Sequence, residues 1–165
     1  MGEFLARAPL PVVVDADALN ALGSLEAVAA VVGRRTHPLV LTPHAGEFTR
    51  LAGAPPGPDR IASVREAAAR SGAIVLLKGS TTVVAEPEGR VLLAASGSPR
   101  LATAGTGDAL SGVIGALIAR GMEPFEAAGY GAHVHGRAAG AGRPEGLVAS
   151  DLPELVSEWL SRVAH

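Results

Sequence analysis

Continuous apolar runs alternate along this chain with segments in which apolar residues recur at helical spacing. The runs, rich in valine, leucine and isoleucine, predict three strands buried on both faces, at 11–15, 39–42 and 74–77. The helical spacing predicts helices at 24–35, 44–51, 61–71, 125–141 and 152–164. Two shorter apolar runs on either side of a Pro-Glu-Gly-Arg turn predict a hairpin of 81–85 and 91–95.

This order of elements favours an α/β fold with a mostly parallel sheet. The length of 165 residues is that of one domain, so we expect residues 1–165 to form a single one. Aromatic residues make up only 3% of the chain, which leaves the core to valine, leucine, isoleucine and alanine. Ligands of such sheets bind beyond the carboxyl ends of the strands, and the chemically suggestive residues here follow strands or begin helices.

A glycine-rich turn leads directly into an apolar helix in the stretch from Leu101 to Gly121. Gly105 and Gly107 lie in the turn, where free backbone N–H groups and the positive end of the helix dipole would attract an anion. Asp108 stands at the same end, and it suits a base that takes a proton from the group attacking phosphorus. Alternatively, Asp108 caps the helix and the glycines form a tight turn without a ligand.

Polar side chains follow the first two predicted strands. Asp15, Asp17 and Asn20 come after the first, where they suit a substrate hydroxyl or a hydrated Mg²⁺; alternatively, they cap a helix or face solvent. His44 and Glu47 come after the second, where the histidine suits a substrate contact and the glutamate a metal contact through water. Glu47 is alternatively an ordinary acid of a first helical turn.

Lys78 ends the third predicted strand and is followed by a glycine and three hydroxyl side chains. A lysine in this place suits a phosphate as a point charge. Alternatively, its ammonium group merely extends from the strand end into water. The residues of this second candidate phosphate site are Lys78, Gly79, Ser80, Thr81 and Thr82.

Charge and composition argue against several functional classes. The 14 basic and 16 acidic residues give a net charge of −2, which offers no electrostatic footprint for nucleic acid. There is no cysteine for a thiolate metal site, and no apolar run approaches the ~20 residues of a membrane span. His133 and His135 would point to opposite sides of a helix, which favours packing and solvent roles over a shared metal. We therefore expect a cytoplasmic protein without nucleic-acid or membrane partners.

Four motifs, spread over the chain from Pro11 to Asp151, resemble one family. They are V-V-V-D-A-D-A-L-N-A-L, L-T-P-H-A-G-E, V-L-L-K-G-S-T-T and A-T-A-G-T-G-D-A-L-S-G-V-I. Together they are similar to the ribokinase-like (S)-NAD(P)H-hydrate dehydratases, also called carbohydrate-kinase-type YjeF C-terminal domains; G-T-G-D alone would indicate only the ribokinase-like superfamily. The resemblance implies a three-layer α/β/α fold. Family domains are longer before Pro11, so we expect a C-terminal portion of the fold, N-terminally truncated relative to the family.

The resemblance implies a two-step repair reaction. With Mg²⁺, ADP or ATP phosphorylates the hydroxyl of the (S)-hydrate of NADH or NADPH (NADHX or NADPHX), and loss of phosphate restores the reduced cofactor; the preferred donor stays open. By similarity, Asp108 binds the hydrate and is the catalytic base, and His44 binds the substrate. The nucleotide-binding residues implied are Lys78, Gly79, Ser80, Thr81, Thr82, Gly105, Thr106 and Gly107. Asp15, Asp17, Asn20 and Glu47 remain candidates for metal or substrate support.

Two other functions stay open at this point. A ribokinase-like kinase of a small alcohol, such as a thiazole or pyridoxal type, would share G-T-G-D but leave the phosphate on its product. A nucleotide-binding module without turnover would bind ADP or AMP and catalyse nothing. In each case an incomplete sheet would expose an edge strand or an apolar face, which predicts self-association into a homo-oligomer.

Overall fold

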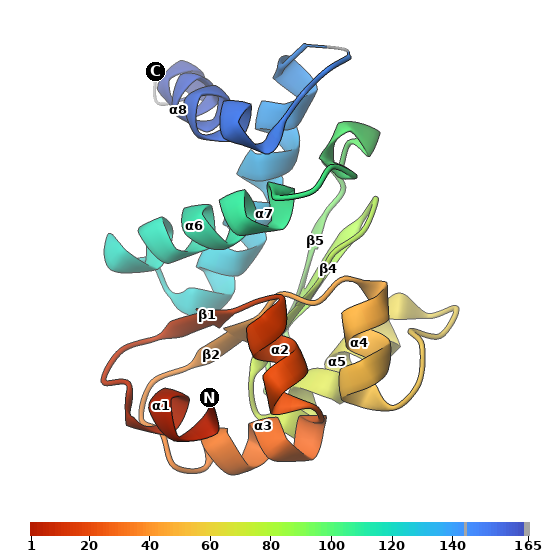
Figure 1. Cartoon of the computed structure of the whole chain (residues 1–165), viewed down its shortest axis with the longest axis vertical. Coiled ribbons are helices and arrows are strands. Elements are labelled where there is room, and N and C mark those ends of the chain that lie inside the picture. The colour runs from red at the N-terminus through yellow and green to blue at the C-terminus, as the bar shows by residue number, and fades with distance from the viewer. Residues whose placement is uncertain (144, 164–165) are drawn as a thin grey trace.

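A five-stranded sheet of order β1-β2-β3-β4-β5 organises the protein (Figure 1). The structure is a computed structural model that describes residues 1–143 and 145–163. β1, β2 and β3 are parallel, whereas β4 is antiparallel to both β3 and β5, so four of the five strands run in one direction. The predicted α/β class with a mostly parallel sheet is confirmed. The strands are β1 (Val12–Val14), β2 (Leu39–Leu41), β3 (Ile74–Leu77), β4 (Thr82–Ala85) and β5 (Val91–Ala94).

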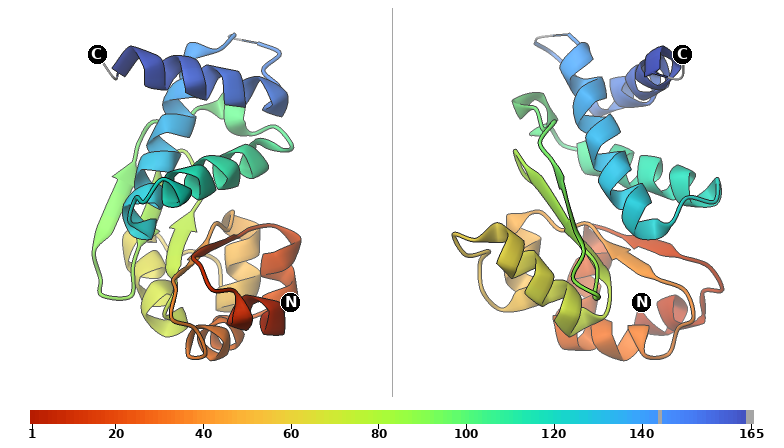
Figure 2. Two further views of the ribbon diagram at one scale, coloured as in Figure 1. Left: turned by 90° about the vertical axis from the view of Figure 1, so that its left-hand side faces the viewer. Right: turned by 180° about the vertical axis from the view of Figure 1, so that it is seen from behind.

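Helices cover both faces of the sheet, which gives three layers (Figure 2). The first five helices pack on one face, α6 and α7 pack on the other, and α8 packs on α7 away from the sheet. The helices are α1 (Gly2–Arg7), α2 (Asp17–Leu22), α3 (Leu25–Val32), α4 (Ala45–Ala52), α5 (Arg60–Ser71), α6 (Thr106–Ala119), α7 (Pro124–Ala141) and α8 (Leu152–Val163), with short 3₁₀ turns η1 (Pro99–Leu101) and η2 (Ala149–Asp151).

The two cores follow the alternation of side chains along the strands. In β2, Leu39 and Leu41 belong to the core under α1–α5, whereas Val40 belongs to the core under α6 and α7. In β3, Leu77 and Leu76 divide between the two cores in the same way. Successive side chains of a strand point to opposite faces, so a strand covered on both sides must be apolar at every position. Burial on both faces of the sheet therefore explains the continuous apolar runs in the sequence.

Most predicted elements are confirmed, with small shifts at their ends. Ser24 caps α3 by accepting a hydrogen bond from the Ala27 N–H, and Gly72 ends α5 in the left-handed region, at φ 66°. The helix predicted over 24–35 ends earlier, at Val32. The prediction for the last helix at residue 164 lies outside the described residues. Helices α1 and α2 were not predicted, because six residues are too few for a helical period to stand out.

β1 forms one edge of the described sheet, with β2 as its paired neighbour. Val12 and Val13 are half-buried there, and Phe4 and Leu10 nearby in the chain are exposed. β1 is therefore the edge strand on this side of the described sheet, with exposed apolar side chains close to it in the sequence. Within the described ranges, no helix has the length and apolar character needed to span a bilayer.

Candidate functional site

Three charged side chains that follow different strands meet in one cluster, with Lys78 between two carboxylates. Its ammonium Nζ lies 2.8 Å from Asp15 Oδ1, after β1, and 3.9 Å from Glu47 Oε2, in the first turn of α4 after β2. All three side chains are largely buried, with exposed fractions of 21% for Lys78, 12% for Asp15 and 7% for Glu47. Parallel strands bring their carboxyl ends to one edge, so residues far apart in sequence form one charged cluster there.

The N-terminus of α6 lies directly beside this cluster. Ser111 Oγ in α6 donates a hydrogen bond of 3.0 Å to Asp15 Oδ2, and the same carboxylate accepts from Lys78 through Oδ1. A Cβ added at Gly107 would lie 3.3 Å from both Asp15 Oδ2 and Lys78 Nζ, closer than most side chains tolerate. Glycine at this position therefore allows the backbone of the first helical turn to approach the lysine.

Asp108 lies in the first turn of α6 and is exposed. The helix begins at Thr106 with Gly105, at φ 85°, as its N-cap, so the alternative in which Asp108 is the N-cap is wrong. The buried Thr106 hydroxyl donates to the carbonyl oxygens of Leu101 and Thr103, at 2.7 and 2.9 Å. The Thr106 N–H also donates to the Thr103 carbonyl oxygen, at 3.4 Å, so Thr106 closes the preceding loop through both its hydroxyl and its backbone.

His44 and Glu47 fix one another at the start of α4. His44 Nδ1 accepts from the N–H groups of Gly46 and Glu47, at 2.9 and 3.2 Å, and Glu47 Oε2 accepts from the His44 N–H at 2.8 Å. This reciprocal capping holds the Glu47 carboxylate near Lys78. An imidazole that accepts through Nδ1 carries its proton on Nε2, which lies 3.5 Å from Glu47 Oε1 on the half-exposed His44 side chain.

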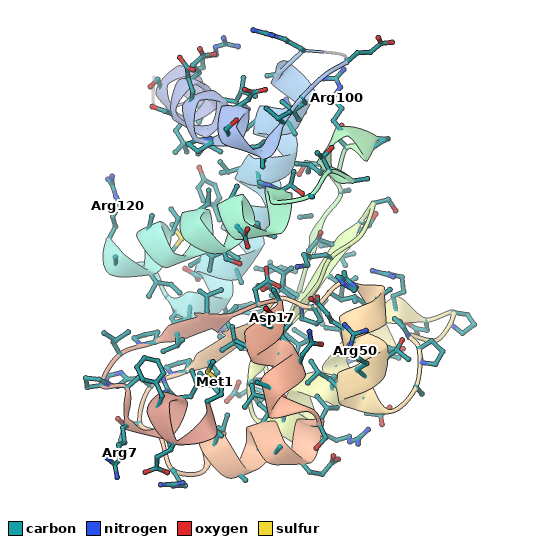
Figure 3. The ribbon with its side chains drawn as sticks, in the orientation of Figure 1. Met1, Arg7, Asp17, Arg50, Arg100 and Arg120 are labelled. Atoms are coloured by element: carbon teal, nitrogen blue, oxygen red, sulfur yellow. The ribbon has the colours of Figure 1, made fainter. Side chains whose placement is uncertain are left out.

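Asp17 and Asn20 do not join the charged cluster. Asp17 is exposed at the start of α2, and Asn20 Oδ1 accepts a hydrogen bond of 3.0 Å from Arg50 Nε on α4 (Figure 3 labels Asp17 and Arg50). The turn between Asp15 and Asp17 is strained, because Ala16 has a φ of 50°, in the region that favours glycine. Strain of this kind concentrates at functional sites.

A cavity of about 330 Å³ opens between the end of β3 and the start of α6. Thr81, Gly105, Asp108 and His44 do not line it. The cavity thus joins the two stretches that the sequence predicts to bind phosphate. Six of the predicted nucleotide-binding residues line it: Lys78, Gly79, Ser80, Thr82, Thr106 and Gly107.

Sequence reasoning missed the remaining walls of the cavity. Gly97 and Ser98, in the loop after β5, and His135 on α7 line it. Burial lowers the pKa of His135 to about 4, and the positive charge of Lys78 acts in the same direction, against a weaker opposing effect of the Thr106 backbone. The one available signal was the run of small residues in α7, which predicts a close approach of that helix to its neighbours.

The described residues suit Mg²⁺ only when the phosphates of a bound nucleotide supply some of its ligands. No cluster of three or more acidic or histidine side chains capable of holding a metal occurs in residues 1–143 and 145–163. Asp15 and Glu47 are nevertheless close to the cavity wall at Lys78. Mg²⁺ is commonly held by one or two carboxylates together with substrate phosphates and water, and this arrangement suits such a site.

Comparisons with known proteins identify curated relatives of this chain. A Mycobacterium leprae bifunctional NAD(P)H-hydrate repair enzyme is 48% identical over 160 residues, which are 97% of this chain and 33% of that protein. The ADP-dependent (S)-NAD(P)H-hydrate dehydratase of Neisseria meningitidis is 46% identical over 91% of this chain and 53% of its own length. The chain thus spans between a third and about half of these curated relatives.

A solved structure gives the same result. The ADP/ATP-dependent NAD(P)H-hydrate dehydratase of Bacillus subtilis, co-crystallised with ATP and Mg²⁺, matches with a TM-score of 0.82 at 30% identity, over 97% of this chain and 57% of that one. The fold is ribokinase-like. The sequence profile described as NAD(P)H-hydrate dehydratase matches residues 2–162. The chain therefore belongs to the NAD(P)H-hydrate dehydratase family.

Proposed function

We propose that this chain carries the nucleotide site and the catalytic base of an ADP- or ATP-dependent (S)-NAD(P)H-hydrate dehydratase. The observation that carries the proposal is the approach of Gly107, at the start of α6, to Lys78, at the end of β3, on the wall of one cavity. A helix N-terminus and a lysine that converge in this way suit the phosphates of a nucleotide. Asp108 lies one residue further along the same helix.

In this proposal the phosphates are bound by backbone and by one positive charge. The first-turn N–H groups of α6 have no partner within the helix, and they add to the positive end of its dipole. Lys78 supplies a full charge and is held by the Asp15 carboxylate, which in turn accepts from Ser111. Gly79, Ser80 and Thr82 complete the phosphate side of the cavity, and Thr81 and Gly105 support it from just outside.

Asp108 acts as the base in the first step. The hydrate's hydroxyl oxygen attacks the terminal phosphorus of the nucleotide, its proton passes to the Asp108 carboxylate, and the nucleotide leaves one phosphate shorter. In the second step the carbon–oxygen bond breaks, phosphate leaves, and the loss of a proton from the neighbouring ring carbon restores the reduced nicotinamide. Asp108 suits this role because it is exposed beside the phosphate site, where the substrate can reach it.

Mg²⁺ would be held by the nucleotide phosphates with Asp15 or Glu47 nearby, and it would neutralise charge that develops on the transferred phosphoryl group. Asp17 and Asn20 are weaker candidates for metal or substrate support, since neither joins the charged cluster. His44 would donate to the substrate from the same edge of the sheet.

We further propose that the protein forms a homo-oligomer through the exposed edge at β1, and that it acts in the cytoplasm, where its nucleotide substrates are made.

A repair assay on the 165-residue chain tests the proposal. NADHX or NADPHX is mixed with Mg²⁺ and either ADP or ATP, and recovery of the reduced-nicotinamide absorbance is followed. We expect recovery, and the faster nucleotide identifies the donor. A stable phosphorylated product without recovery would replace the proposal with a kinase. Nucleotide binding without any reaction would show that this chain holds the phosphate site but not a complete active site.

A further inference from the structure

One buried nitrogen atom, on a residue that lines the cavity, has no hydrogen-bond partner among the described residues. His135, on α7, is 6% exposed and lines the cavity together with Lys78 and Gly107. Its Nε2 atom is inaccessible to water and has no hydrogen-bond partner in residues 1–143 and 145–163. A buried nitrogen without a partner opposes folding, because it has lost its bond to water and gained nothing in exchange. The Thr106 backbone interacts with the imidazole and favours its charged form, but Nε2 itself stays without a partner among the described residues.

We propose that His135 is a ligand-contacting residue, whose Nε2 forms a hydrogen bond with an uncharged polar group of the nucleotide bound in this cavity. The inference rests on the proposed function, because it takes the cavity to be the nucleotide site. It adds a residue of α7 to a site otherwise built from strand ends and from the start of α6.

The backbone of α7 at His135 is held close to the loop that forms part of the cavity wall. The next residue, Gly136, packs so closely on the loop after β5 that an added Cβ would lie 2.4 Å from the Ser96 carbonyl oxygen. That loop continues into Gly97 and Ser98, which also line the cavity. A glycine at this point lets α7 approach the loop, and this close packing fixes the backbone that carries His135. A group positioned in this way contributes to binding without first having to be ordered.

The neutral state of the His135 ring indicates which part of the nucleotide it contacts. Its lowered pKa, about 4, keeps the ring neutral at pH 7, and Lys78 nearby opposes a second positive charge. The phosphates already have Lys78 and the N-terminus of α6 as partners. A neutral imidazole instead suits a ribose hydroxyl or a polar edge of the base. His135 would then help to distinguish a nucleotide from inorganic phosphates.

His133, two residues away on the same helix, provides a contrast. It is exposed and packs edge-on against Trp159 of α8, with ring centroids 5.7 Å apart. Its role is explained by a contact within the protein, as the opposite directions of the two side chains predict. His135 has no such explanation, which supports a role toward a ligand.

The test compares ADP binding by calorimetry for the wild type, His135→Leu and His135→Gln. Leucine has a similar volume but no polar atom, whereas glutamine can return a polar atom to the position of Nε2. We expect ADP affinity to fall about tenfold or more in His135→Leu and to stay within about threefold in His135→Gln. Inorganic pyrophosphate, which lacks ribose and base, should bind wild type and His135→Leu equally.

Thermal melting without nucleotide completes the test. Because Nε2 has no partner in the empty cavity, His135→Leu should melt at the wild-type temperature or above it. If His135→Leu melts lower, or binds ADP as tightly as the wild type, the inference is overturned while the proposed function stands. If the wild type itself does not bind ADP, the proposed function fails first. Measurements with 2′-deoxy-ADP and IDP then distinguish a contact to the ribose from a contact to the base. The analogue that lacks the group bound by His135 should bind the wild type and His135→Leu equally.

Discussion

The two ends of the sheet each hold a carboxylate paired with a basic side chain, and the two pairs differ in their surroundings. At one end Asp15 binds Lys78, both are largely buried, and the glycine-rich turn of α6 and a cavity lie beside them. At the other end both oxygens of the buried Glu86 accept from Arg90, whose guanidinium also lies 4.7 Å from the centre of the Phe125 ring.

This difference indicates that the Asp15–Lys78 pair belongs to a binding site, whereas the Glu86–Arg90 pair is structural. The guanidinium of Arg90 is occupied on its edge by Glu86 and on its face by Phe125, and the Glu86 hydrogen bond raises the pKa of Arg90. Lys78 instead meets its carboxylates beside the backbone of Gly107, which a side chain there would cover.

A charge pair beside a cavity does not by itself identify a site, because Glu86 and Arg90 also line a cavity, of about 590 Å³, at the start of α7. There the Glu123 side chain already accepts from the N–H groups of Phe125 and Glu126. The N-cap of α6 is Gly105, which has no side chain to fill this place, so the N-terminus beside Lys78 is left open to an anion.

The largest expected effect is on turnover. Asp108→Asn should lower the rate of repair by about 10² or more, the scale of a lost general base, because the amide cannot accept the hydroxyl proton. ADP affinity should change little, since the backbone of α6 is kept. Glu88→Gln, an exposed acid at the Glu86 end, is the matched control and should leave the rate unchanged. Full activity of Asp108→Asn would remove Asp108 from the mechanism.

The second prediction exchanges the two basic residues for methionine. Lys78→Met should weaken ADP binding about thirtyfold, because a phosphate loses its charged partner. Arg90→Met should leave ADP affinity unchanged but lower the free energy of unfolding, because buried Glu86 loses its partner. Calorimetry and urea unfolding on both variants check this. Equal losses of affinity would erase the distinction between the two ends.

The third prediction concerns acid stability at the cavity end. The pKa of His135 is about 4 in the folded protein, below the 6.5 of the free side chain, so between these values the unfolded state binds more protons. The free energy of unfolding should therefore fall by roughly 2 kcal/mol between pH 6.5 and pH 5 through this group. Urea unfolding at several pH values should show that His135→Leu lacks this part of the slope. His37→Gln, at the opposite end, should retain it.

The smallest effect is expected from the glycines of α6. Gly107→Val should weaken ADP binding about tenfold, because its side chain would intrude on Asp15 and Lys78. Gly112→Ala, on the same helix with open space around its Cβ position, should keep wild-type affinity and gain up to about 1 kcal/mol in stability. Unchanged ADP binding in Gly107→Val would argue against backbone contact with the phosphates.

Local patterns predicted the elements, and the parallel topology predicted that their ends would meet. The apolar runs before Asp15 and Lys78 each predict a strand without reference to the rest of the chain. A parallel sheet places the ends of both strands at one edge. The sequence could not reveal that Ser111 bonds Asp15, 96 positions away, or that His135 closes the cavity, because both depend on how α6 and α7 pack. Nor could it show that His44 and Glu47 cap α4 reciprocally while Asn20 binds Arg50.

The central claim is that the phosphates of a nucleotide bind between β3 and α6, and an amide NMR titration with ADP tests it most directly. We predict that the amide signals of residues 78–82 and 105–108 shift in proportion to bound ADP, while those of residues 86–90 stay in place. Shifts confined to residues 86–90, or spread evenly over both ends of the sheet, would contradict the account.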